Sequence, residues 1–224
     1  MNADQNPTAV NPISLLVEAS RRDSFETFRE EMSQSMLFPE KSRNRQFAME
    51  RAIQTDLDGG LYVEFGVAAG KGCRQFGKML APHGKRFHGF DSFEGLEEDW
   101  TGIQTGRTAG AFSQGGTLPR VPGNVTLVKG WIQDTLPTYL TETESAPFSF
   151  IHMDMDTYTP TRVALELVKP RLRKGTVILF DELYGYPGWR HHEYKALQEV
   201  LSADDYCFLC FSNEAVAIEL LRHP

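Results

Sequence analysis

From Gly60 onward, short apolar runs alternate along the chain with longer amphipathic stretches. The short runs have the length and the β-branched or aromatic content that favour buried strands. We predict strands at residues 61–65, 86–90, 125–128, 148–153, 176–180, 206–211 and 215–220. The longer stretches predict helices at about residues 71–80, 161–171 and 190–201. Strands that alternate with helices are typical of an α/β protein with a mostly parallel sheet.

The first part of the chain is predicted to be helical, because residues 13–55 are rich in helix-forming residues. Apolar residues recur there near one face of a helix, at Phe25, Phe28, Met32 and Met36. We interpret this stripe as core packing. The basic run 41–45 is interpreted as a solvated turn, with contact to an anionic ligand as the alternative. We therefore expect a helical N-terminal extension or lid at residues 1–58 and a single domain at residues 59–224.

Two further segments modify this picture. Only three residues separate the runs 206–211 and 215–220, which is the spacing of a hairpin and predicts one antiparallel strand at the end of the sheet. Residues 92–124 contain recurrent glycines but no long periodic segment. A substrate-covering loop and a disordered surface insertion are equally good interpretations of this interval.

Composition limits the class of protein. The chain has 224 residues, of which 41% are hydrophobic, enough for one well-buried domain with an extension. Its formal net charge of -7 argues against a nucleic-acid partner, because phosphate backbones are bound by clustered Lys and Arg. The N-terminus lacks the pattern of a secretory signal, and no stretch approaches the roughly 20 apolar residues that span a bilayer. We predict a cytoplasmic protein without a membrane partner.

The three cysteines do not suggest a disulfide framework. An odd number suits a reducing compartment. Cys207 and Cys210 form a C-x-x-C, but they fall within a predicted strand, where alternation places residues three apart on opposite faces. We interpret Cys73, Cys207 and Cys210 as core thiols, with a metal or redox pair as the weaker alternative.

The strongest local motif is a strand followed by a glycine-rich turn and a helix, at residues 61–72. Glu64 stands near the end of the strand, and Gly66, Gly70 and Gly72 follow it. Glycine lets the backbone turn sharply and approach a ligand, and the helix start offers free N–H groups. We therefore predict that these four residues bind a nucleotide-type cofactor, with a glycine-rich turn that binds nothing as the alternative.

The spacing of the glycines distinguishes three kinds of cofactor-binding turn. A dinucleotide fingerprint needs G-x-G-x-x-G, which is missing from the motif. A P-loop needs G-x-x-x-x-G-K-[ST], and here the chain is one residue short and carries Cys73 in place of the hydroxyl residue. The remaining pattern, E-x-G-x-x-x-G-x-G, resembles that of class I methyltransferases. Their cofactor carries a methionine ammonium and carboxylate in place of a pyrophosphate.

A second signal is Asp91, which ends the strand after the glycine-rich turn. In an open α/β sheet, a carboxylate at this place lies beside the ligand crevice and can accept both hydrogen bonds from a ribose diol. A carboxylate that merely caps the strand-to-loop turn is the alternative.

A third signal is a group of acids at the ends of two later strands. If these strands are adjacent and parallel, their ends lie about 5 Å apart, and Asp154, Asp181 and Glu182 converge. Carboxylates this close repel one another unless a divalent cation binds between them. Oxygen ligands favour Mg²⁺, with Mn²⁺ or Ca²⁺ possible. The alternative is a protonated carboxyl, or one that is paired with Arg162 or Arg190.

The stretch from residue 62 to residue 183 resembles the macrocin O-methyltransferase (TylF/MycF-like) family, metal-dependent class I methyltransferases of sugar hydroxyls in natural products. The matching stretches are VEFGV at 63–67, DSFEGL at 91–96, GWIQDTL at 130–136, HMDMDTY at 152–158 and FDE at 180–182. Two features depart from the family pattern. Glu182 stands where Asp or Asn is expected, and the aromatic segment 183–192 has no match.

The resemblance implies a Rossmann-like, seven-stranded sheet in the order 3-2-1-4-5-7-6. It implies S-adenosyl-L-methionine (SAM) and Mg²⁺ as cofactors. SAM contacts are implied for Glu64, Gly66, Asp91, Ser92, Gly130 and Trp131. The magnesium ligands are implied to be Asp154, Asp181 and Glu182.

The expected reaction is methyl transfer to a small hydroxylated acceptor, a sugar or natural product. The cation would lower the pKa of the acceptor hydroxyl and align its oxygen with the methyl carbon. The general base is sought among His191, His192, Asp154 and Asp156, and we name Asp154 and His192 as catalytic. Surface positions at a helix start are the alternative for both histidines.

Two other functions stay open at this level. An NAD-dependent oxidoreductase would share the sheet and the ribose acid, although its fingerprint is missing. A non-catalytic SAM-binding or scaffold protein would keep the fold for partner contact, but it has no need to hold three acids in one crevice. The amphipathic N-terminal extension is also compatible with a homodimer.

Overall fold

A twisted eight-stranded sheet runs through the computed structural model, which describes residues 11–103 and 105–224. The strand order is β1-β7-β8-β6-β5-β2-β3-β4. The strands are β1 (Met36–Leu37), β2 (Leu61–Phe65), β3 (Phe87–Asp91), β4 (Val125–Lys129), β5 (Phe148–Met153), β6 (Val177–Phe180), β7 (Tyr206–Ser212) and β8 (Ala215–Leu220). β8 runs antiparallel to both of its neighbours, and the other pairs are parallel.

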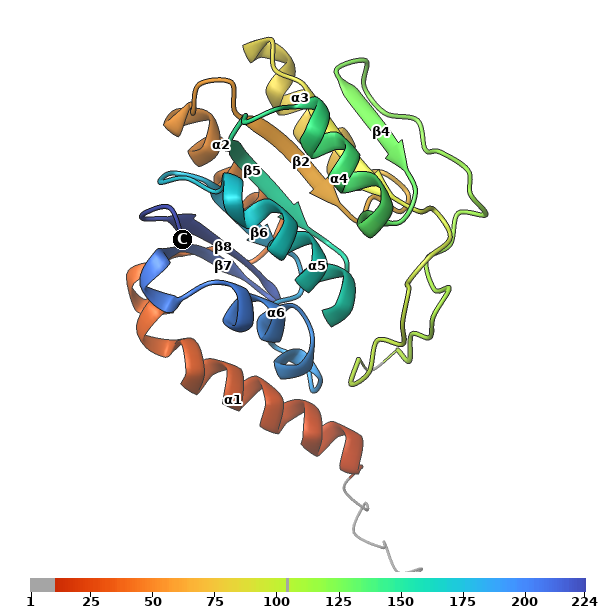
Figure 1. The fold of residues 1–224 in the computed structure, drawn as a ribbon. Helices are drawn as coiled ribbons and strands as arrows, with labels where there is room; N and C mark the ends of the chain where they lie inside the picture. Colours follow the sequence, from red (N-terminus) through yellow and green to blue (C-terminus); the bar gives the residue numbers. More distant parts are fainter. Residues whose placement is uncertain (1–10, 104) are drawn as a thin grey trace, which may run out of the picture.

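Helices cover both faces of the sheet (Figure 1). α4, α5 and α6 form a row on one face, and α2 and α3 pack on the other. The helices are α1 (Pro12–Gln34), α2 (Lys41–Thr55), α3 (Lys71–Leu80), α4 (Ile132–Glu142), α5 (Tyr158–Val168) and α6 (Glu193–Val200). Short 3₁₀ helices are η1 (Ala81–His83), η2 (Lys169–Arg171), η3 (Trp189–His191) and η4 (Ala203–Asp205). Among the described residues, no helix is long and apolar enough to cross a bilayer.

The central strands are apolar on both sides, as expected for strands covered by helices on both faces. In β5, Ile151 and Met153 join the core beneath α4–α6, whereas Phe150 joins the core beneath α2 and α3. β2 alternates in the same way, and its Glu64 falls on the side of α2 and α3. Glu64 is in register with His152 of β5, so two polar side chains meet inside an otherwise apolar layer.

The register of the parallel strands aligns their carboxyl ends. Phe65 is paired with Met153, and Met153 with Phe180. The residues that follow continue the ladder, because Asp154 N–H donates to Phe65 O and Asp181 N–H donates to Met153 O, at 2.8 and 3.0 Å. The acids after β5 and β6 therefore lie at one edge of the sheet, as the sequence predicted.

The predicted fold is confirmed. All seven predicted strands are present, and in chain order they lie in the sheet as 3-2-1-4-5-7-6. β1, a two-residue edge strand parallel to β7, makes eight strands instead of seven. It interrupts the N-terminal helical segment. α4 was not predicted, and Pro137 in its interior obscures its helical pattern.

Several local predictions need correction. Of the apolar stripe, Phe28 is buried among aromatic rings, but Phe25 and Met36 are half exposed, so core packing was wrong for those two. The run 41–45 is not a turn but the start of α2. The described cysteines are free, as expected; Cys73 and Cys210 are buried, but Cys207 is partly exposed.

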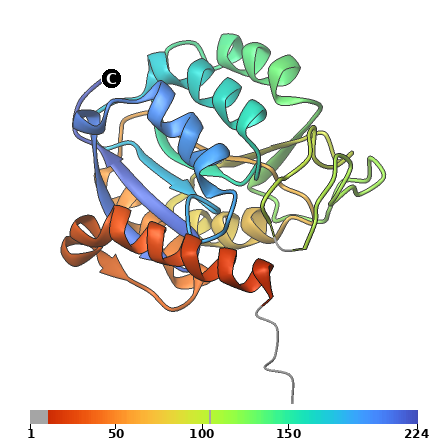
Figure 2. The ribbon, with the colours of Figure 1, turned by 90° about the horizontal axis from the view of Figure 1, so that it is seen from below.

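The segment between β3 and β4 lies beside the strand ends, on the opposite side of the molecule from the C-terminus (Figure 2). In residues 92–103 and 105–124, the structure has no helix or strand, only an isolated bridge between Trp100 and Arg107. The segment is nevertheless fixed by side chains. Glu98 accepts hydrogen bonds from the backbone and hydroxyl of Thr159 in the first turn of α5, both at 2.8 Å. These contacts favour an ordered covering loop.

Candidate active site

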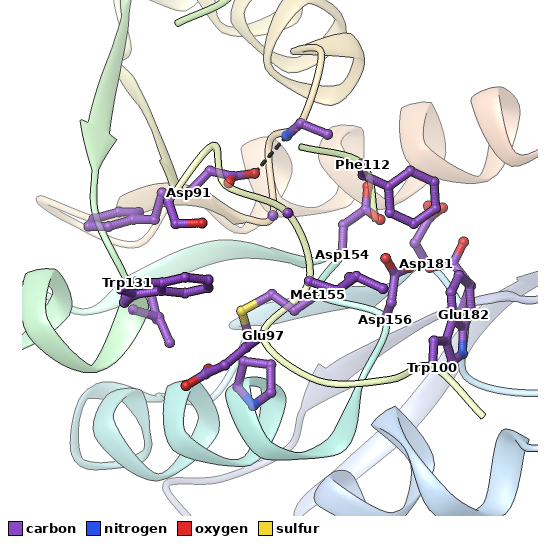
Figure 3. A pocket seen from close by; sticks show the side chains of 18 of the residues that line it. Asp91, Glu97, Trp100, Phe112, Trp131, Asp154, Met155, Asp156, Asp181 and Glu182 are labelled. Atoms are coloured by element: carbon purple, nitrogen blue, oxygen red, sulfur yellow. Dashed lines mark hydrogen bonds between the residues drawn. The ribbon is translucent and has the colours of Figure 1, made fainter. Parts of the chain in front are cut away.

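A cavity of about 320 Å³ opens at the carboxyl ends of the parallel strands. Five strands each supply a residue to its lining: Gly66 after β2, Asp91 of β3, Gly130 after β4, Asp154 after β5 and Asp181 after β6. Its size is within the range of small-molecule sites, and this edge of an open α/β sheet is where ligands bind. Figure 3 shows Asp91 and Trp131 at one end and the acids at the other.

Gly66 begins the turn after β2 with a φ of +89°, a conformation that favours glycine. A Cβ atom at this position would lie 1.7 Å from the carbonyl oxygen of Asp154. Gly72 is equally constrained, because a Cβ there would lie 1.7 Å from Oε1 of Glu64. Gly70, the N-cap of α3, also has a positive φ. Gly66 lines the cavity, whereas Gly70 and Gly72 do not. Packing of the chain against itself therefore accounts for two of the three glycines.

Asp91 ties the turn to the next loop. Its Oδ2 accepts hydrogen bonds from the backbone N–H groups of Val67 and Ala68, both at 2.7 Å. Its Oδ1 accepts one from Phe93 N–H at 2.6 Å. The carboxylate also lines the cavity, together with Ser92. It can thus face a ribose while it holds the backbone on both sides of the crevice.

Gly130 and Trp131 follow β4 and line the cavity, where Trp131 lies at the same end as Asp91 (Figure 3). Gly130 has a φ of +145°, and its backbone N–H donates to Asp91 O at 2.9 Å. The indole of Trp131 gives this end a flat apolar wall, which suits an aromatic base. Of the residues that the sequence assigned to SAM, the structure places Gly66, Asp91, Ser92, Gly130 and Trp131 around one cavity.

Glu64 lies beneath the cradle. It is 1% exposed, and His152 donates to its Oε1 at 2.8 Å. The other ring nitrogen of His152 contacts Asp181 Oδ1 at 3.2 Å. Burial opposes a charged ring, but the hydrogen bonds to Asp181 and Glu64 outweigh it and raise the pKa of His152 to about 9. A buried ionic chain therefore runs from the glycine-rich turn to the acidic end.

The acidic end brings the predicted carboxylates together, with one addition. Asp154, Asp156 and Glu182 each offer an oxygen within 4.8 Å of the others. Asp181 lines the cavity beside them but belongs to a different set of contacts. Asp156 is buried and has a φ of +62°, a strained conformation for a residue other than glycine. Sequence reasoning named Asp156 only as a possible base.

These acids differ in charge. Burial, with the charge of Asp181, raises the pKa of Asp154 to about 7. Burial and neighbouring carboxylates raise the pKa values of Asp156 and Glu182 well above their usual range. Burial acts on Asp181 in the same direction, but the His152 hydrogen bond and the charges of His152, Lys41 and Arg45 hold its pKa well below the usual range. One firmly charged acid thus lies beside three that resist ionisation.

The donor set fits a hard divalent cation. Three carboxylates converge, and Oε2 of the buried Glu182 has no hydrogen-bond partner among the described residues. A cation bound there would complete that oxygen and relieve the repulsion between the acids. The structure thus places Asp154, Asp181 and Glu182 at one end of the cavity, and their role as ligands stays a prediction.

Two cations that sequence reasoning missed come from α2. Arg45 is 6% exposed and donates to Asp181 Oδ1 from Nε and from a terminal nitrogen, at 3.1 and 2.7 Å. Lys41 Nζ lies 2.7 Å from Glu182 Oε1. The solvated-turn interpretation was therefore wrong. The available signal was their spacing, because residues four apart share one face of a helix.

The alternative partners, Arg162 and Arg190, were wrong as well. Arg162 pairs with Glu166 at 2.8 Å, and Arg190 pairs with Asp23 at 2.8 Å, both in exposed positions. Neither contributes to the lining of the cavity.

The two histidines differ. His191 is exposed, but His192 is buried and its Nε2 lies 2.9 Å from the carbonyl oxygen of Thr101. Burial lowers the pKa of His192. The surface interpretation is therefore wrong for His192. Neither histidine lines the cavity, whereas Asp154 does.

The fold and the site together define the class of protein. An α/β sheet in this order, with one antiparallel strand and a glycine-rich turn after its central strand, is the Rossmann-like fold of class I methyltransferases. Residues 63–183 match the family described as "Methyltransferase domain", which is more than half of the chain. The chain belongs to this family and is a SAM-dependent methyltransferase.

Solved structures give the same fold. "Crystal Structure of CalS11, Calicheamicin Methyltransferase" has 21% identity and a TM-score of 0.66, and covers 98% of each chain. An apo structure of CalS11, described as a TDP-rhamnose 3'-O-methyltransferase, has 21% identity and a TM-score of 0.59, over 92% of this chain and 90% of that one. The O-methyltransferase NovP has 18% identity and a TM-score of 0.59, over 94% and 98%. Among curated proteins, none matches the chain by sequence.

Proposed function

We propose that this chain transfers a methyl group from SAM to a hydroxyl of a small molecule, a sugar or a natural product, with the help of Mg²⁺. The observation that carries the proposal is the two-ended cavity, with a nucleoside-type end at Asp91 and Trp131 and an acidic end at Asp154 and Glu182. The resemblance to macrocin O-methyltransferases and the likeness to CalS11 and NovP support an oxygen acceptor.

The residues of the first end would hold SAM. Asp91 would accept the ribose hydroxyls, Trp131 would cover the base, and Gly66, Ser92 and Gly130 would border the cofactor. We propose that Glu64, Gly70 and Gly72 act on SAM indirectly, by shaping the glycine-rich turn, since they are not among the residues that line the cavity. SAM supplies an electrophilic methyl group on its sulfonium. The chain itself needs only to orient that group toward the acidic end.

The acidic end would hold the acceptor and the cation. Asp154 and Glu182 would be two of the metal ligands. The third would be Asp181, as the resemblance implies, or Asp156, as the convergence of the carboxylate oxygens favours. Bound Mg²⁺ supplies Lewis acidity that lowers the pKa of the acceptor hydroxyl. Asp154 would orient that hydroxyl from the cavity wall. Burial and the charge of Asp154 raise the pKa of Asp156 well above its usual range, so its ionised carboxylate would be a stronger proton acceptor than an ordinary one.

His192 is a second proposal for the base, and it requires the ring to leave Thr101. The contact with the Thr101 carbonyl holds Nε2 outside the cavity lining. A domain boundary between residues 58 and 59, a cytoplasmic location and a homodimer also stay predictions. The exposed Ile13, Leu16 and Phe25 of α1 are compatible with the dimer.

The test is a mass-shift screen. Purified chain and methyl-labelled SAM are incubated with free sugars, nucleotide sugars, catechols and phenols, with Mg²⁺ or with excess EDTA. We expect one added methyl group on an oxygen of at least one acceptor, and its loss with EDTA or with Asp154→Ala. The variant should still bind SAM in calorimetry. Full activity in EDTA would contradict the role of the metal, and methylation of nitrogen or carbon would contradict the acceptor class.

A further inference from the structure

Lys41 reaches the acidic end from the first turn of α2. Its Nζ lies 2.7 Å from Glu182 Oε1, 3.2 Å from Asp181 Oδ2 and 3.3 Å from Glu214 Oε2. The side chain is 24% exposed. One ammonium group is thus held by three carboxylates, two of which are predicted metal ligands.

We propose that Lys41 is an internal cation that competes with the divalent metal, which binds fully only when Lys41 leaves Asp181 and Glu182. This inference rests on the metal site of the proposed function. A lysine ammonium is a compact point charge on a flexible stem, so it can take the place of a hard cation among carboxylates and can also move away.

The oxygen atoms available for a metal support the competition. Asp181 has no free side, because its Oδ1 accepts from Arg45 and His152, and its Oδ2 accepts from Lys41. Glu182 has its Oε1 on Lys41 and its Oε2 without a partner among the described residues. The backbone N–H of Glu182 is itself fixed by Glu193 at 3.1 Å. A metal that uses Asp181 Oδ2 or Glu182 Oε1 must therefore displace the ammonium.

The Lys41 side chain can move toward a second cavity. A separate cavity, between α1 and the turn that joins β7 to β8, is lined by Arg21, Ser24, Lys41, Tyr184 and Glu214 among others. Lys41 thus lines this second cavity and contacts two acids, Asp181 and Glu182, that line the first. Rotation of its side chain would keep the ion pair with Glu214 and release the other two carboxylates. Arg45 has no such exit, because it is buried and lines the main cavity.

The charges favour replacement of the Lys41 ammonium by the metal over binding of the metal beside it. Two positive charges on α2, those of Lys41 and Arg45, balance part of the acidic cluster. A divalent ion that enters beside an unmoved ammonium would be repelled by it at short range, because both are positively charged. If Lys41 moves to Glu214, the metal keeps the attraction of the carboxylates without that repulsion.

The test measures Mn²⁺ binding directly, by the loss of the free-ion electron paramagnetic resonance signal. The variants are Lys41→Gln, which removes the charge, and Lys41→Arg, which keeps it. Lys85→Gln is the matched control, because Lys85 pairs with Asp56 at 2.6 Å near the amino end of β3, at the opposite edge of the sheet. We expect Lys41→Gln to bind Mn²⁺ at least about tenfold more tightly than the wild type, or about 1.4 kcal/mol. The other two variants should stay within about threefold of the wild type.

Equal or weaker binding by Lys41→Gln would overturn the proposal, as would a lack of Mn²⁺ binding by both the wild type and this variant. In the latter case, methyl transfer by the wild type without added metal would still support the enzyme. A second measurement needs no variant. In crystals of the wild type with Mn²⁺ at the acidic end, we expect Lys41 Nζ to pair with Glu214 alone. An ammonium that still bridges Asp181 and Glu182 would contradict the exchange.

Discussion

Replacing Gly72 by alanine tests whether this glycine serves the ligand or the packing of the chain. A Cβ at this position would lie 1.7 Å from Oε1 and 2.8 Å from Cδ of Glu64, which is 1% exposed and cannot swing into solvent. The new atom must therefore displace either α3 or a buried carboxylate that is bonded to His152.

The size of the effect follows from three contributions. Overpacking of this kind costs about 1–3 kcal/mol. A weakened buried hydrogen bond between Glu64 and His152 adds about 1 kcal/mol. The better helix propensity of alanine offsets about 1 kcal/mol. We expect Gly72→Ala to lower the free energy of unfolding by about 2 kcal/mol, and the melting temperature by about 4–8 °C for a chain of this size.

The assay is denaturant unfolding of Gly72→Ala, Glu64→Ala and the double variant. Glu64→Ala makes room for the new methyl group, so the two changes should be less harmful together than their sum, by about 1–2 kcal/mol. Gly123→Ala is the control, because a Cβ there meets nothing within 4 Å. If Gly72→Ala is as stable as the wild type but binds SAM poorly, the steric argument is refuted and Gly72 contacts the cofactor.

Three further outcomes are expected. Asp91→Ala removes the acceptor of three backbone hydrogen bonds, so its SAM dissociation constant, measured by calorimetry, should rise at least about tenfold; an unchanged constant would count against Asp91. His152 has a pKa raised from 6.5 to about 9, so its stabilisation is complete below pH 6.5 and is lost as the pH rises through about 9. Unfolding free energies should fall across this window in the wild type, and His152→Gln should flatten the slope. Gly188→Ala would place a Cβ 2.2 Å from the Thr101 carbonyl, so trypsin should cut the 92–124 segment faster, and equal cutting rates would contradict its docking there.

The sequence predicted the fold well because the dominant signal is local. The apolar runs that alternate with helical stretches predict the strands. The acids directly follow two of these strands, so their position does not depend on how the helices pack. The register then makes convergence of Asp154 and Asp181 a geometric necessity. α4 was missed because Pro137 and few apolar residues leave a weak pattern. β1 is too short for any periodic signal.

The charge partners of the acids were less predictable, because they come from a distant part of the chain. Lys41 and Arg45 precede the acids by more than a hundred residues, and α2 brings them over the strand ends. No local pattern says where a helix will dock. The role of the aromatic segment 183–192 could not be predicted from the sequence either. Its Tyr186 and His192 are buried against Trp100 and Thr101 of the segment between β3 and β4. This contact joins parts of the chain that are distant in sequence, so no local pattern predicts it.

The contact between Gly66 and Asp154 has a consequence for anyone who redesigns this enzyme. A side chain at position 66 would clash with the Asp154 carbonyl, so the glycine-rich turn after β2 and the end of β5 are in direct contact. In the proposed function, the turn would face the cofactor and the end of β5 would face the acceptor. A library that varies position 66 to accept other cofactors would at the same time displace Asp154, which we propose to lie on the acceptor side. Such a library should therefore recover only glycine at position 66. Selection for new acceptors should instead yield substitutions in the 92–124 segment and in residues 183–192.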